Sequence, residues 1–145
     1  MLRYCFVLMV LTSPNTWGQD SIANGSMANI TAGEYRPLYL SIDSPLVTVV
    51  PFRLDRQPVT NREFQQFVAE NKKWQRGEIP SLFAESGYLN HWKKSSSQYD
   101  PNPADLEKPV IFVSWYAAQA YCEAQQKRLP TIAEWEFVAQ ASSIQ

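Results

Sequence analysis

The chain has 145 residues, which is enough for one domain and too few for two ordinary ones. Hydrophobic residues make up 45% and charged residues 19%, which excludes a disordered chain, and the formal net charge of −1 excludes a dedicated nucleic-acid binder. One histidine and two cysteines leave very little material for a metal site or a disulfide framework.

The first 18 residues have the features of a secretory signal peptide. Arg3 places a positive charge ahead of an apolar run, residues 4–11, and Pro14 follows that run. A bilayer span takes about 20 apolar residues, whereas the apolar core of a signal peptide takes about 7–15. We therefore expect cleavage after Gly18, a periplasmic or secreted mature protein, and no membrane span. The alternative interpretation of the run is a buried N-terminal strand.

A flexible lead is predicted over residues 19–32, which are small and polar and show no pattern, and the domain is predicted over residues 33–145. A short strand is expected around Tyr35. A longer one is expected over residues 46–55, where β-branched residues give way to alternating apolar and charged ones. Because proline donates no ladder hydrogen bond, Pro51 predicts an edge or a bulge in this strand.

A helix is predicted to begin after Thr60, which forms with Glu63 the Thr-x-x-Glu pattern of a capping box. Gly77 and Pro80 are predicted to end it. Its apolar positions recur at helical spacing and give it one buried face, made by Phe64, Phe67 and Val68.

Residues 75–109 form a long irregular stretch, and loops of this length inside a compact domain are often functional. Trp92 and Tyr99 indicate that the stretch is pinned to the body of the protein. Its aromatic side chains could also line a peptide groove, because aromatic residues anchor recognition sites.

The last third of the chain predicts a short apolar strand over residues 110–113 and two helices. Ser114 is expected to cap the first helix, which runs to Gln125. Thr131 and Glu134 form a second capping box that opens the last helix.

Two blocks of sequence resemble the formylglycine-generating enzyme family, also called the sulfatase-modifying-factor family. The first is FRLDRQPVTNREF, residues 52–64. The second combines PVIFVSW, AYC, KRLPT and AEWEF, within residues 109–137. The resemblance implies an α+β fold, irregular and C-type-lectin-like, with short strands and capped helices. It also implies that complete relatives oxidise a protein cysteine to formylglycine with copper and oxygen.

The chain departs from the family pattern in several places. Gly33 keeps only the start of the usual Gly-x-Phe-x-Met-Gly opening, and Ile132 stands where an acidic residue is usual. By the resemblance, residues 33–145 are the N-terminal part of the domain, and the active cysteine pair and calcium-binding loops belong to the second half. We therefore expect a truncated form of the domain, with copper and calcium only in full-length relatives and no cofactor in this chain.

Several side chains could take part in catalysis or metal binding, but for each of them we favour a structural interpretation. Cys122 is alone once Cys5 leaves with the signal peptide, and it is read as a small buried residue on a helix. By the resemblance, a related branch of the family that acts in sulfoxide synthesis for ergothioneine holds iron with a cluster of histidines. His91 is the chain's single histidine and cannot replace such a cluster, so it is read as a loop residue. The remaining candidates are helix caps, loop acids or surface charges: Glu134, Glu136, Asp100, Asp105, Lys93 and Lys94. The sequence thus predicts no catalytic, cofactor-binding or metal-ligating residue.

The sequence as a whole predicts an exported family member that is inactive alone and whose partner is a protein or peptide substrate. One alternative is a non-catalytic periplasmic accessory or binding module for the maturation of a reductase or other enzyme, with residues 77–109 as its contact surface. A second alternative is a truncated reading frame without a stable product.

Overall fold

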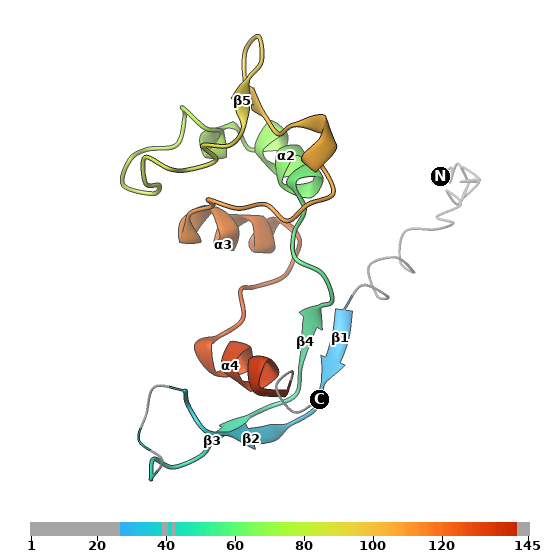
Figure 1. The fold of residues 1–145 in the computed structure, drawn as a ribbon, viewed down its shortest axis with the longest axis vertical. Coiled ribbons are helices and arrows are strands. Elements are labelled where there is room, and N and C mark those ends of the chain that lie inside the picture. The colour runs from blue at the N-terminus through green and yellow to red at the C-terminus, as the bar shows by residue number, and fades with distance from the viewer. Residues whose placement is uncertain (1–26, 39–40, 42, 142–145) are drawn as a thin grey trace, which may run out of the picture.

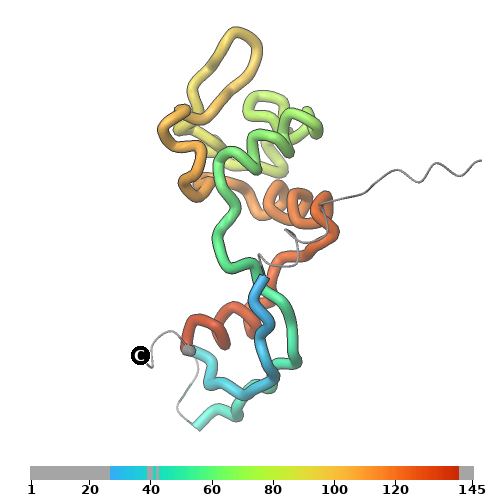
Figure 2. The backbone as a smooth tube through the Cα atoms, turned by 90° about the vertical axis from the view of Figure 1, so that its right-hand side faces the viewer, coloured from blue at the N-terminus to red at the C-terminus, as the bar shows by residue number. Residues whose placement is uncertain are grey.

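The computed structural model describes residues 27–38, 41 and 43–141. The predicted signal peptide lies outside these residues. Figures 1 and 2 show an elongated molecule in which a group of strands with one helix is joined to a second, mainly helical group by two chain segments. We call these the strand lobe and the helical lobe. The architecture is α+β, as the sequence predicts. Among the described residues, no helix is long and apolar enough to cross a membrane.

The strand lobe contains two antiparallel strand pairs. β1 (Met27–Ile30) pairs with β4 (Phe52–Asp55), and β2 (Gly33–Tyr35) pairs with β3 (Val47–Val49). The strand predicted over residues 46–55 is therefore two strands, interrupted at Pro51, where an edge or a bulge is expected.

β1 corrects the prediction of a flexible lead for its four residues. The segment has no amphipathic pattern, but Ile30 lies opposite Phe52 and Met27 opposite Asp55, so the partner strand satisfies its backbone groups. The short strand expected around Tyr35 is present as β2, and residues 39 and 40 lie outside the described residues.

Helix α4 (Ile132–Ala141) packs on β2 and β3. The Phe137 ring lies so close to Gly33 that a Cβ atom there would be 2.6 Å from the ring. Phe137 also meets Tyr35 edge to face, with ring centroids 6.4 Å apart. The Gln140 amide donates to the carbonyl of Arg36 at 2.6 Å. Gly33 is thus required for close approach between helix and sheet.

The helical lobe begins with α2 (Asn61–Glu70), and its capping box is present as predicted. The Thr60 hydroxyl accepts from the Glu63 amide at 3.2 Å, and the Glu63 carboxylate accepts from the Thr60 amide at 2.8 Å. The helix ends earlier than predicted, with Asn71 as its C-cap, and continues as the 3-10 helix η1 (Lys72–Trp74).

Helix α3 (Trp115–Ala124) begins at the predicted cap, where the Ser114 hydroxyl accepts from the Ala117 amide at 3.2 Å. The strand predicted over residues 110–113 is absent. Phe112 has a φ of +55°, which breaks an extended segment, and its carbonyl accepts from the Leu89 amide at 2.8 Å. Separate backbone contacts, this one and the hydrogen bond from the Val110 amide to the Val59 carbonyl at 2.9 Å, stand in place of a strand ladder.

The core of the helical lobe joins α2 and α3 to the long irregular stretch. Its buried members are Phe64, Phe67, Val68, Tyr88, Leu89, Trp92 and Ala117. Three of these come from residues 75–109, which confirms that this stretch is pinned to the body. The stretch also contains a small hairpin of β5 (Lys93–Lys94) and β6 (Tyr99–Asp100), followed by the 3-10 helix η2 (Pro103–Asp105).

Candidate functional site

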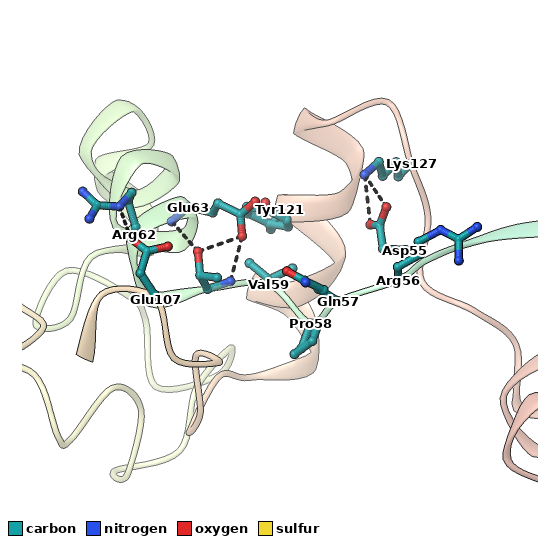
Figure 3. Close-up of a pocket in the computed structure, with 11 residues that line it drawn as sticks. Asp55, Arg56, Gln57, Pro58, Val59, Arg62, Glu63, Glu107, Tyr121 and Lys127 are labelled. Carbon is teal, nitrogen blue, oxygen red and sulfur yellow. Dashed lines mark hydrogen bonds and ion pairs between the residues drawn. The ribbon is translucent and has the colours of Figure 1, made fainter. Parts of the chain in front are cut away.

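A polar pocket of about 540 Å³ lies where the end of β4 leads into α2 (Figure 3). Its walls come from the segment around Pro58, from Glu107, and from Tyr121 and Lys127 at the end of α3 and beyond. Burial raises the pKa of Tyr121 to about 12, so its hydroxyl is neutral at physiological pH.

Most of the charged side chains of this pocket are engaged with each other, as the dashed lines of Figure 3 show. The Lys127 ammonium donates to both carboxylate oxygens of Asp55, at 2.8 and 2.9 Å. Arg62 donates to Glu107 at 2.6 Å. The Asp55–Lys127 pair ties together the two chain segments that connect the lobes. These charged side chains therefore stabilise the walls of the pocket. The sequence alone does not predict the Asp55–Lys127 pair, because its two members are far apart in the chain.

Asn61 is the polar centre of the helical lobe, and the sequence analysis missed it. The residue is 2% exposed at the first position of α2. Its amide nitrogen donates to the carbonyls of Asp105 at 3.0 Å and Lys108 at 3.2 Å. Its amide oxygen accepts from the buried indole of Trp92 at 3.0 Å. One side chain thus fixes the long irregular stretch at two places. In the sequence, the only signal that could have identified Asn61 is its place next to the capping residue Thr60 in the first block.

His91 lies beside this centre. Its Nε2 is 3.3 Å from the Asn61 amide oxygen, its ring is 5.8 Å from that of Phe112, and its buried Nδ1 has no hydrogen-bond partner. Burial lowers the pKa of His91 below its ordinary value. The structure places it in a loop, packed against aromatic rings, with no second histidine available.

Cys122 is half-buried on α3, and it is the free cysteine among the described residues. Burial raises its pKa, and the nearby Asp55 carboxylate acts in the same direction. A thiol is nucleophilic and binds metal as the thiolate, so these surroundings disfavour reactivity. The residue lies on a helix as predicted, but it is half-buried where the sequence analysis expected it to be buried.

Glu134 caps α4 as predicted, with its carboxylate accepting from the Thr131 amide at 2.7 Å. It is also buried and paired with Arg128 through two hydrogen bonds, at 2.7 and 2.5 Å. This bidentate pair lowers the pKa of Glu134 to about 2. Glu134 therefore ties the KRLPT segment to the first turn of α4. The capping-box pattern predicts its bond to Thr131 but not its pair with Arg128.

The other candidates lie apart from one another. Asp100 accepts from Gln65 and Gln98, and Asp105 pairs with Lys108. Burial and then the nearby Glu136 carboxylate raise the pKa of Tyr35, and both lysines of β5 are exposed.

No group of three or more His, Cys, Asp or Glu among the described residues could hold a metal ion. The family resemblance implies copper, and Cu(I) prefers soft thiolate ligands. The described residues offer one thiol, that of Cys122, which is half-buried and has a raised pKa. The donors among the described residues therefore do not fit copper.

A second hollow of about 440 Å³, which we call the aromatic groove, lies between residues 81–88 and 112–116. Its lining is largely apolar, and Glu85 is its charged member. The large side chains that line it are Leu82, Phe83, Tyr88, Phe112, Trp115 and Tyr116.

Comparison with known proteins identifies the family. The model of the sulfatase-modifying factor enzyme 1-like domain (FGE-sulfatase) matches residues 17–145. The chain belongs to this family. The resemblance seen in the two sequence blocks is therefore confirmed, and so is the α+β architecture expected of a sulfatase-modifying-factor domain.

Several curated relatives are similar to the chain in sequence. Inactive C-alpha-formylglycine-generating enzyme 2 of Mus musculus is 35% identical over 116 residues, covering 64% of this chain and 38% of the relative. Formylglycine-generating enzyme of Streptomyces coelicolor is 28% identical over 149 residues, covering 86% and 48%. Hercynine oxygenase of Mycobacterium tuberculosis is 32% identical over 101 residues, covering 63% and 24%. The chain spans less than half the length of these relatives.

Proposed function

We propose that this chain is an exported structural half of a sulfatase-modifying-factor domain and that it does not oxidise a protein cysteine by itself. The observation that carries the proposal is the state of Cys122. It is half-buried on α3, its pKa is raised by burial, and it is the sole thiol of the described residues. Oxidation of a substrate cysteine on copper needs two thiols close together, in a form that can bind the metal.

In the proposed role, the chain forms a structural scaffold of the kind that supports the reaction in a complete relative. Asn61 fixes the long irregular stretch to α2, and the Arg128–Glu134 pair fixes the entry to α4. These contacts order elements without supplying an acid–base pair or an activated nucleophile. In a complete domain, the reaction would be copper- and oxygen-dependent conversion of a protein cysteine to formylglycine.

The test of activity uses the purified chain, a cysteine-containing sulfatase peptide, copper and oxygen. Mass spectrometry of the peptide reports conversion of the thiol to the aldehyde. We expect no conversion above a blank without protein. Conversion that disappears in the Cys122→Ser variant would contradict the proposal, because it would assign the chemistry to this single thiol. A cooperative thermal transition of the same sample would exclude the interpretation of an unstable fragment.

Export is supported by Arg3, the apolar run of residues 4–11 and the small residue Gly18. We expect the chain, expressed in a bacterial host, to be found in the periplasm with Gln19 as its first residue. Leu8→Arg, inside the run, should hold the precursor in the cytoplasm. Ile22→Arg, outside it, should not. Recovery of an uncleaved cytoplasmic protein would refute the export proposal.

A non-catalytic binding role is the second candidate. It is favoured by the mouse relative, whose name describes it as inactive and which shares 35% identity with this chain. In that role the chain would bind a protein or peptide and leave its cysteine unchanged. Both candidates predict no conversion of the peptide, so a pull-down with the same peptide separates them: a binding module retains the unconverted peptide and a scaffold half does not.

A further inference from the structure

We propose that His91 is a pH-sensitive latch that holds Phe112 on the wall of the aromatic groove and releases it when the imidazole is protonated. The latch consists of the Asn61 amide, the His91 ring and the Phe112 backbone, which has a positive φ. It belongs to the fold of the helical lobe and does not depend on the proposed function.

The hydrogen bonds of Asn61 determine which nitrogen of His91 carries the proton. The Asn61 amide nitrogen donates to the carbonyls of Asp105 and Lys108, so the amide oxygen faces the other way. That oxygen accepts from the Trp92 indole at 3.0 Å and lies 3.3 Å from Nε2 of His91. Because an amide oxygen only accepts, Nε2 carries the hydrogen and Nδ1 is the unprotonated nitrogen of the neutral ring.

A second proton on His91 would have no partner in this arrangement. Nδ1 is buried and has no hydrogen-bond partner among the described residues. Protonation there would create both a buried positive charge and a buried N–H donor without an acceptor, and each of these is costly. His91 as a whole is only half-buried, so rotation of its side chain brings the charged ring into water. Acid therefore favours a state in which the ring has left Asn61 and Phe112.

The charged groups around His91 do not remove this cost. Burial lowers the pKa of His91 below 6.5, the Asp105 carboxylate of η2 acts in the opposite direction, and Arg76 lowers it further. Asp105 is already paired with Lys108 at 2.6 Å, and Arg76 is held by hydrogen bonds to three backbone carbonyls within residues 89–92. The contacts that His91 receives from α2 and from the segment before α3 are uncharged.

Phe112 is the residue that the latch holds in place. Its ring lies 5.8 Å from that of His91, lines the groove and is 55% exposed. Its φ of +55° is one that a bulky side chain keeps only where its surroundings hold it there. Its carbonyl accepts at 2.8 Å from the amide of Leu89, a fully buried core residue. When His91 leaves, the Phe112 ring loses a supporting contact, its backbone relaxes, and the hydrogen bond from Leu89 opens.

The experiment is an NMR titration of the full chain with pH, in which His91 can be followed alone because it is the single histidine. Long-range proton–nitrogen spectra of the imidazole give its tautomer and its pKa. The nuclear Overhauser effect between the rings of His91 and Phe112 reports their contact. Hydrogen exchange of the Leu89 amide, corrected for the intrinsic effect of pH, reports the backbone hydrogen bond.

At neutral pH we expect the proton on Nε2 and a clear Overhauser effect between the two rings. Below the measured pKa of His91, which should lie below 6.5, the effect should disappear and the Leu89 amide should lose protection. By linkage, the released population in acid rises about tenfold for every unit that separates the measured pKa from 6.5, and Leu89 protection should fall by that ratio. The remaining amide signals should keep their dispersion, because the release is local.

His91→Gln is the decisive variant, because the glutamine amide can donate to the Asn61 oxygen at every pH and does not titrate. Its Leu89 protection should not change across the same pH range. Glu85→Gln is the matched control, because it removes the charged residue that lines the groove and leaves His91 in place. This variant should keep the pH dependence of the unaltered chain.

Four results would overturn the inference: a proton on Nδ1 at neutral pH, a His91 pKa at or above 6.5, equal Leu89 protection above and below that pKa, or a pH dependence that persists in His91→Gln. Loss of all dispersed amide signals at the pKa of His91 would also overturn it, because the chain would then unfold as a whole. If circular dichroism shows that His91→Gln is unfolded, the tautomer, the pKa and the ring contact of the unaltered chain still decide the outcome.

Discussion

Replacing Asn61 with alanine tests whether one buried amide organises the helical lobe. The substitution removes two hydrogen bonds to the carbonyls of Asp105 and Lys108. It also removes the amide oxygen that accepts from the Trp92 indole and lies 3.3 Å from Nε2 of His91. Both carbonyls keep a second donor, since Lys108 still receives the backbone amide of residue 61 and Asp105 that of Lys108. The indole keeps none, and Trp92 is 2% exposed.

The expected cost follows from these contacts. The lost hydrogen bonds contribute about 0.5–1.5 kcal/mol each, and a buried donor left without an acceptor costs about 1–3 kcal/mol. We therefore expect Asn61→Ala to lower the free energy of unfolding by about 3 kcal/mol. Asn71→Ala is the matched control on the same helix, because Asn71 is half-buried and donates to a single carbonyl, that of Phe67. It should cost about 1 kcal/mol.

The assay is urea unfolding followed by tryptophan fluorescence and circular dichroism, with a double-mutant cycle that adds Trp92→Phe. Phenylalanine has no indole donor, so the penalty of the orphaned N–H disappears from the double variant. The two changes should be less than additive by about 1–2 kcal/mol. The reasoning is refuted if Asn61→Ala costs no more than Asn71→Ala, or if the two changes simply add.

Three further predictions concern packing and pH. Gly33→Ala should lower the free energy of unfolding by about 1–3 kcal/mol, because the new Cβ meets the Phe137 ring, whereas Gly87→Ala, with its nearest neighbour at 3.9 Å, should be nearly neutral in the same urea titration. The pKa of Glu134 is lowered from 4.5 to about 2, so the stability that its ionised form contributes is complete above pH 4.5 and is lost as pH falls toward 2. In Glu134→Gln the melting temperature should depend less on pH across that window. An unchanged pH dependence would contradict the pairing with Arg128. The pKa of His91 is lowered below 6.5 by burial, so just below that pH the unfolded chain binds more protons than the folded one and stability should fall as pH decreases. His91→Gln should remove this loss of stability. A pH dependence that persists in the variant would assign the loss to another group.

The helix starts could be predicted because each depends on residues three positions apart. Thr60 with Glu63, and Thr131 with Glu134, form their reciprocal hydrogen bonds within one turn, so the pattern carries the structure. The family could also be recognised from its two blocks, since these keep residue type and spacing together. The buried face of α2 follows from periodicity alone.

The polar centre of the helical lobe and the ion pair of the pocket depended on contacts that no local pattern contains. The Asn61 side chain bonds to residues 30 to 48 positions away, and the Asp55–Lys127 pair spans 72 positions. The sequence alone determined where helices begin, which faces are apolar and which family the chain resembles. Only the tertiary structure decided that Met27–Ile30 is a strand, that Phe112 adopts a left-handed backbone, and that one asparagine holds the long stretch. The physical reason is that backbone and side-chain polar groups take whichever partner burial brings close, and distance along the chain does not limit that choice.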